Sequence, residues 1–260
     1  MRLPPIAHRY GWTPDLPDPR DRPFGLRAPR PLASLPARTD LRAQMPPVYD
    51  QGTLGSCTAN ATGALLAFHL RSRRGFALWK PSRLFIYYNE RARERTVAID
   101  AGAQIRTGIK TLAQEGCPPE PLWPYSDRIP GPFSKRPSPA AYARAKAQRA
   151  ASYERLPRTA LAMRSCLASG LPFAFGFTVF EGFESPDVAK TGTVPLPGPG
   201  QRPLGGHAVV AVGYDDATER FLVRNSWGAL WGARGHCTLP YSYLLDEDLA
   251  DDFWTVRAVT

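Results

Sequence analysis

A single cysteine closes the glycine-containing run DQGTLGSCTA, residues 50–59, just before a helical pattern begins. Cysteine is a nucleophile only as the thiolate, and its pKa falls at a helix N-terminus or beside a protonated histidine. Cys57 lies where the glycine turn meets the predicted helix, so the helix dipole favours its anion. Gly52 and Gly55 permit a tight turn that a cysteine placed only for packing does not require. The run therefore predicts a nucleophilic thiol; the alternative is a buried structural cysteine.

The composition, 43% hydrophobic and 22% charged over 260 residues, is typical of a globular protein with one large domain or two small ones. No apolar run approaches the roughly 18 residues that a membrane span needs. The first twelve residues, MRLPPIAHRYGW, lack the apolar stretch of a signal peptide. We therefore expect no membrane association, and the sequence favours a cytoplasmic location, with signal-independent export as the alternative.

The charge is uneven: residues 1–160 carry a net +14 and residues 161–260 a net −4. The basic residues are scattered and no nucleic-acid motif is present, so we interpret them as a solvated surface rather than a nucleic-acid site.

The four cysteines form no CxxC pair, and we expect no metal and no cofactor. If one cysteine is a nucleophile, the other three cannot all pair within the chain, which favours a reducing compartment.

The chain divides into a proline-rich arm, residues 1–44, and a domain that carries the predicted nucleophile, residues 45–260. The proline-rich composition of the arm predicts an extended, polyproline-like segment with aromatic anchors at Tyr10, Trp12 and Phe24. Apolar periodicity and stop signals predict helices over 57–75, 81–95, 106–116 and 138–156. Short β-rich runs predict strands over 172–180, 207–214 and 221–225. Helices first and strands later indicate an α+β fold with two subdomains, a helical part over about 45–125 and a β-rich part over about 126–260, with a cleft between them.

A thiolate needs a base, and the chain has four histidines to supply it. His8 lies in the arm, and His69 is about 18 Å along the helix of the cysteine, too far to reach it. His207 follows two glycines and begins a strand, whereas His236 has no glycine-flanked approach, so His207 is the better candidate. The hairpin formed by the two strands returns Asn225 to the neighbourhood of His207, where its amide can hold the imidazole.

Two further side chains complete the predicted site. Gln51, six residues before Cys57, is placed to donate with the cysteine backbone N–H to the oxyanion of a tetrahedral intermediate; the alternative is a surface glutamine. Trp227 is placed to cover the bond between His207 and Asn225; the alternative is core packing.

Three blocks, QGTLGSC, GGHAVVAVGY and RNSWGALWGARG, resemble the cysteine, histidine and asparagine blocks of the papain-like (C1) cysteine peptidases, in the family's order. The resemblance spans about residues 45–245 and implies a papain-like fold with a helical and a β-barrel-like subdomain. It implies catalytic roles for Cys57 as nucleophile, His207 as base, Asn225 as orienting residue and Gln51 as oxyanion donor. It also implies substrate-binding positions at Gly102, Gly205, Gly206 and Ala208.

The sequence departs from the family at two positions near the nucleophile. Thr58 stands where the family usually has tryptophan, and Leu54 where many members have a disulfide cysteine. These departures resemble the bacterial and archaeal branch of the family.

We therefore predict a monomeric cysteine endopeptidase that takes peptide or protein substrates. The alternatives are a thiol acyl transferase, such as a peptide ligase or amidase, and a non-catalytic binding module on the same scaffold. For the arm we predict a short pro-segment that covers the cleft in cis; the alternatives are a flexible tail and a strap far from the site.

Overall fold

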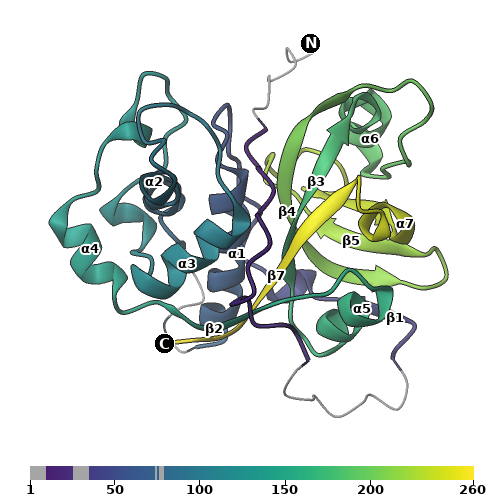
Figure 1. Cartoon of the computed structure of the whole chain (residues 1–260), viewed down its shortest axis with the longest axis horizontal. Helices are drawn as coiled ribbons and strands as arrows, with labels where there is room; N and C mark the ends of the chain where they lie inside the picture. The colour runs from purple at the N-terminus through teal and green to yellow at the C-terminus, as the bar shows by residue number, and fades with distance from the viewer. Residues whose placement is uncertain (1–9, 26–34, 74, 76–78) are drawn as a thin grey trace.

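The computed structural model describes residues 10–25, 35–73, 75 and 79–260, in which a helical part and a sheet part lie side by side (Figure 1). The helical part contains α1 (Cys57–Arg71), α2 (Arg83–Glu94), α3 (Ile105–Gln114) and α4 (Pro139–Ala145). Ser82 and Ser138 begin α2 and α4 as N-caps, each accepting a hydrogen bond from a backbone N–H of the first turn. None of the helices in the described ranges is long and apolar enough to cross a membrane.

The sheet part is a seven-stranded antiparallel sheet: six strands follow in the order β2-β7-β3-β4-β5-β6, and the seventh, β1, pairs with β4. The strands are β1 (Arg38–Asp40), β2 (Ala150–Arg155), β3 (Phe173–Phe180), β4 (Pro203–Asp215), β5 (Arg220–Arg224), β6 (His236–Pro240) and β7 (Ala250–Val259). The helices α5 (Ala160–Ala168), α6 (Pro186–Thr191) and α7 (Tyr241–Leu245) pack around the sheet (Figure 1). Short 3-10 helices lie at Arg42–Gln44, Glu120–Leu122, Pro132–Ser134 and Glu181–Glu184.

The helix α1 lies between the two parts and is buried on nearly all sides (Figure 1). Its Leu65 and Leu66 belong to the same apolar cluster as Phe173 and Phe175 of β3. A helix that is apolar all round is one that a core surrounds. The start of α1, and with it Cys57, is therefore fixed from both sides.

The prediction of one helix over 138–156 is wrong in its second half. The helix ends at Ala145, and Ala150–Arg155 forms β2, which pairs with β7. The alanine-rich run has helical propensity, but pairing with β7 gives residues 150–155 a tertiary partner that propensity alone does not reveal. Because α4 packs on Phe85 of α2, it belongs to the helical part, which therefore extends beyond residue 125.

The arm lies across the junction of the two parts (Figure 1). The N–H of Trp12 donates to the carbonyl of Gly206 over 2.9 Å, and the N–H of Ala103 donates to the carbonyl of Gly11 over 2.7 Å. The described residues 10–25 thus bond to the sheet part on one side and to the helical part on the other. Residues 38–40, which the sequence placed in the arm, form β1 and belong to the sheet.

Candidate active site

The strands β4 and β5 bring together the predicted histidine and asparagine. His207 Nε2 lies 2.8 Å from Asn225 Oδ1, and since the amide oxygen only accepts, the ring nitrogen donates. The same oxygen accepts from the backbone N–H of Ser226 over 2.8 Å. Both side chains are buried, so the imidazole is held in one orientation with little competition from water.

Aromatic rings enclose this pair. The indole of Trp227 lies 5.1 Å from the imidazole of His207, centroid to centroid, at an interplanar angle of 33°. The rings of Phe177 and Tyr10 approach the same imidazole edge-on, at 5.8 and 6.1 Å. Trp227 is itself buried and belongs to the apolar core, so it both packs in the core and covers the imidazole.

Cys57 is the first residue of α1 and its side chain is completely buried. The backbone amides of Ala208 and Gly11 face its thiol and lower its pKa, and Ala208 directly follows His207 along β4. Burial has the larger effect and raises the pKa of Cys57 to about 12. Burial is thus the largest influence on this thiol in the structure, where Gly11 of the arm lies against it.

Gln51 is completely buried, which excludes the surface alternative. Its Oε1 accepts from the hydroxyl of Ser226 over 2.6 Å, and its Nε2 donates to the carbonyl of Leu54 over 2.9 Å. Its backbone N–H also donates to the carbonyl of Ser226, over 2.8 Å. Ser226 therefore links Gln51 directly to Asn225 and fixes the orientation of the glutamine amide. The bond to Leu54 uses one of the two amide hydrogens of Gln51.

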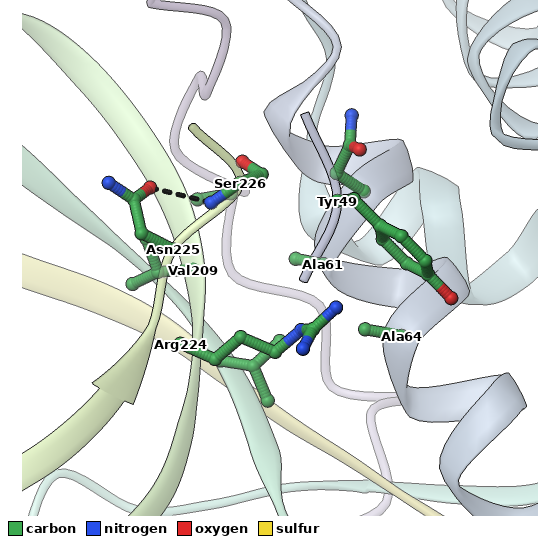
Figure 2. Close-up of a pocket in the computed structure, with 10 residues that line it drawn as sticks. Tyr49, Ala61, Ala64, Val209, Arg224, Asn225 and Ser226 are labelled. Atoms are coloured by element: carbon green, nitrogen blue, oxygen red, sulfur yellow. Dashed lines mark hydrogen bonds between the residues drawn. The ribbon is translucent and has the colours of Figure 1, made fainter. Parts of the chain in front are cut away.

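A small internal cavity lies behind Asn225, between α1 and β5 (Figure 2). Ala208 is one of the buried residues that line it. In the figure the side chain of Arg224 extends across the cavity toward Tyr49. Its guanidinium donates to the carbonyls of Pro46 and Pro47, over 2.8 and 2.5 Å, and so ties the segment that leads to Gln51 onto the sheet.

The other two histidines that the structure describes bond elsewhere. The ring of His69 lies 2.7 Å from the carbonyl of Val256, and the ring of His236 lies 2.9 Å from the carbonyl of Arg234. His8 lies outside the described residues. Of the three described histidines, His207 is the one that directly precedes Ala208, whose backbone amide faces the thiol of Cys57.

Comparison with known proteins identifies the family of the chain. The model of the papain family cysteine proteases matches residues 35–243. The chain belongs to the papain family. Xylellain, a cysteine protease from Xylella fastidiosa, is 39% identical to it, with a TM-score of 0.90 over the whole of both chains. An uncharacterized peptidase C1-like protein of Acanthamoeba polyphaga mimivirus is 40% identical over 98% of this chain and 88% of its own length. The procathepsin B S9 of Trypanosoma congolense, 16% identical with a TM-score of 0.67 over 84% of this chain and 76% of its own, shares the fold.

These comparisons confirm the expected papain-like fold and the expected family of cysteine peptidases, which are hydrolases. The similarity to xylellain also agrees with the predicted likeness to bacterial members of the family.

In this papain-family chain the arm occupies the space over the thiol. Gly11 lies against the backbone of Gly102, where a Cβ would be 2.1 Å from the Gly11 carbonyl oxygen. Gly102 also has φ +74°, a conformation that favours glycine. Gly205 lies against the ring of Tyr10, and Gly206 against Trp12. The predicted substrate-binding glycines are therefore the residues that the arm contacts.

Trp12 anchors the arm in a hollow next to Gly176 and Gly206. Its indole N–H donates to Asp252 Oδ2 over 3.0 Å, and the backbone N–H of Asp15 donates to the same oxygen over 2.7 Å. In return, Asp15 accepts from the indole of Trp254 over 3.0 Å. The arm is therefore docked by apolar burial and by buried hydrogen bonds to β7.

The pose of the arm is unsuited to attack by the thiol. Gly11 presents its backbone N–H to Cys57, while its carbonyl is bonded to the N–H of Ala103. Trp12 pairs with Ala103 in the parallel sense. Nucleophilic attack needs a carbonyl carbon at the thiolate with its oxygen facing the oxyanion donors. At Gly11, therefore, the docked arm presents an N–H and not a carbonyl carbon to the thiol.

Sequence reasoning missed three residues: Ser226, which contacts the site, and Asp252 and Glu90, which hold its neighbours. Ser226 stands inside the asparagine block and so could have been noticed. Asp252 and Glu90 are joined to the site through residues far away in the sequence, Trp12 and Thr58, and no local pattern marks them.

Proposed function

We propose that this papain-family chain is a cysteine endopeptidase in which Cys57 is the nucleophile. An extended peptide takes the place of the arm, and the thiolate attacks the scissile carbonyl carbon. His207 holds the thiol proton and gives it to the leaving amine; it then takes a proton from water, which hydrolyses the thioester and regenerates Cys57. The observation that carries this proposal is the oriented His207–Asn225 pair, with the next residue of β4, Ala208, presenting its amide to the thiol.

The remaining roles follow from the contacts of each side chain. Gln51, held by Ser226 and Leu54 at the glycine turn before α1, stabilises the oxyanion together with the backbone N–H of Cys57. Asn225 orients the imidazole, and Trp227 keeps water away from their bond. The peptide backbone pairs with the segment at Gly102 that the arm now occupies.

We also propose that the arm restrains the enzyme. Its proline-rich sequence loses less conformational entropy on docking than a flexible chain would, because proline fixes φ. While it is docked, substrate cannot enter and the thiol stays neutral. Release of the arm hydrates the thiol, lowers its pKa and opens the cleft together.

Product analysis tests the proposed reaction directly. A defined peptide library, digested by the chain after the arm has been cut from it, is analysed by mass spectrometry with and without an added amine nucleophile. Endopeptidase action gives internal cuts with new free carboxyl ends. Joined peptides or amine adducts as the main products would instead identify an acyl transferase, and no product at all a binding module.

Gln51→Ala is expected to lower kcat by roughly 10²–10³-fold, the typical effect of removing one oxyanion donor. KM for a small fluorogenic peptide should change much less, because the lost interaction forms only in the transition state. Ser226→Ala serves as the control: it removes a hydroxyl that orients Gln51, and should therefore have a smaller effect in the same direction. A Gln51→Ala enzyme with unchanged kcat would remove this residue from the mechanism.

Asn225→Ala is expected to lower kcat less than His207→Ala does. Asn225 orients the imidazole through one hydrogen bond, whereas His207 transfers the proton. Steady-state kinetics of both variants on one substrate provide the comparison. Equal losses would mean that Asn225 does more than hold the ring.

Trp12→Ala is expected to raise kcat/KM of the full chain by about tenfold or more. The substitution removes a buried aromatic side chain and its bond to Asp252, and loss of such an anchor weakens packing by ~3 kcal/mol. Leu16→Ala is the matched control, since Leu16 lies in the same arm but is 77% exposed. If both variants keep the activity of the full chain, the arm does not limit access to the site.

A further inference from the structure

A carboxyl group lies buried one residue beyond the nucleophile. Glu90 of α2 is completely buried, and its Oε2 accepts from the hydroxyl of Thr58 over 2.9 Å. Thr58 directly follows Cys57 in the first turn of α1, at the position where the family usually has tryptophan. Thr62, one turn further on, donates to the carbonyl of Thr58 over 2.8 Å. The turn of α1 that carries the thiol is thus tied to α2 through Glu90.

The structure makes room for this carboxyl group. Gly108 of α3 faces it, and a Cβ there would lie 2.5 Å from Glu90 Oε1 and 2.9 Å from the methyl of Thr62. A larger residue on α3 would displace either the carboxyl or the first turns of α1. The close approach of the three helices therefore places Glu90 next to α1.

No positive charge pairs with Glu90 among the residues that the structure describes, and its Oε1 has no hydrogen-bond partner there. The neighbouring Arg91 attracts a charge on Glu90, but less than burial disfavours it, and its guanidinium donates to the backbone carbonyls of Tyr87, Val97, Ile99 and Phe133. Glu94, one turn along α2, would repel a charge on Glu90, and Gly108 presents no side chain from α3. An unpaired carboxylate in such a place is much less stable than the neutral acid.

We propose that Glu90 is a positioning residue, which holds the Cys57 turn through Thr58 and which must be un-ionised for the Cys57 thiolate to form. A neutral carboxyl keeps the hydrogen bond to Thr58 without placing a negative charge beside the developing thiolate. Burial raises the pKa of Glu90 well above its ordinary value, and a charge on Glu90 would raise the pKa of Cys57. The inference rests on the proposed role of Cys57 as nucleophile.

The protonation state is measured first, by infrared spectroscopy of the full chain near pH 7. The spectrum of Glu90→Gln is subtracted from that of the unaltered chain, so that every other carboxyl group cancels. We expect the difference to contain the carbonyl stretch of one un-ionised carboxyl group. A carboxylate pair of bands in its place would show that Glu90 is ionised and would overturn the proposal.

The positioning role is measured by the pH dependence of Cys57 alkylation by iodoacetamide in the full chain, with the labelled residue located by mass spectrometry. Thr58→Val removes the hydroxyl and keeps the shape, and we expect alkylation below pH 7 to slow by about tenfold, equivalent to a rise of about one unit in the thiol pKa. Thr58→Ser and Glu90→Gln, which keep a neutral hydrogen-bonded pair, should remain within about threefold of the unaltered chain.

A purely structural role predicts a different result. Thr58→Val would then lower the melting temperature without moving the pH profile, and that result would overturn the proposal. Iodoacetamide reaches Cys57 only when the arm opens. Because this opening affects the alkylation rates of the variants and of the unaltered chain equally, it cancels when those rates are compared as ratios. Alkylation and infrared spectra do not require peptidase activity, so failure of this inference is distinguishable from failure of the proposed function.

Discussion

Cutting the chain within residues 26–34 after it has folded, and removing the released arm, will raise kcat/KM on a small fluorogenic peptide by about 100-fold or more. The arm bonds to both sides of the site, at Gly206 and Ala103, and covers the thiol of Cys57. A thrombin site engineered into this segment allows the cut to be made in the folded protein. The cut leaves β1 intact, whose residues 38–40 pair with β4. A deletion of residues 1–40 would remove that strand.

The same cut is expected to change the protonation of the nucleophile. Burial raises the pKa of Cys57 to about 12 while the arm is docked, so removal of the arm lowers that pKa toward and below its ordinary value. Alkylation of Cys57 at pH 5–6 should then become fast, whereas Cys117, Cys166 and Cys237 should remain slow because all three are buried within the domain. The uncut chain with the inserted site is the control. Unchanged activity and labelling after complete cutting and removal of the arm would contradict an inhibitory arm.

Cys57→Ala is expected to lower kcat of the cut enzyme by roughly 10⁵–10⁶-fold, as removal of a nucleophile does in enzymes that act through an acyl intermediate. The fold should survive, because alanine fits the space and α1 is held by core contacts along its whole length. Cys117→Ala is the matched control, since Cys117 is also completely buried and free. Its activity should stay near that of the unaltered enzyme, and the melting temperatures of both variants should be similar.

The arrangement of the site could be predicted where the sequence carries local signals. The glycine turn and apolar run at 50–71 predict the start of α1, and the structure begins that helix at Cys57. The two strand patterns and their polar turn predict the hairpin that places Asn225 beside His207, and the 2.8 Å bond agrees with it. Periodicity and turn chemistry act within a few residues of each other, so they can be recognised in the sequence.

The rest depends on partners that are distant in the sequence. Residues 150–155 form a strand because they pair with β7, which lies a hundred residues later in the chain. The alanine-rich composition of the segment cannot reveal this distant partner. Asp252, which holds Trp12 and Asp15, has a φ of +60°, a conformation that only its tertiary surroundings maintain. The anchors Tyr10 and Trp12 could be recognised as aromatic residues in an extended arm. The residues that pack against them in the domain could not be assigned to them from the sequence.

The position of the arm also explains a difference between the sequence and the structure. A cysteine at a helix N-terminus predicts a lowered pKa, yet the docked state raises the pKa of Cys57. In the structure, where the arm lies over this thiol, burial is the largest influence on its pKa. We therefore expect the helix N-terminus and His207 to determine the state of the thiol only after the arm has left.

The acyl-enzyme is the central claim, and rapid-quench mass spectrometry of the cut enzyme tests it most directly. The enzyme is mixed with an activated peptide ester, quenched in acid within the first turnover, digested and mapped. The account predicts an acyl group on Cys57, absent from Cys57→Ala and present in Asn225→Ala at a slower rate of formation. An acyl group on any other residue, or continued turnover by Cys57→Ala, would contradict it.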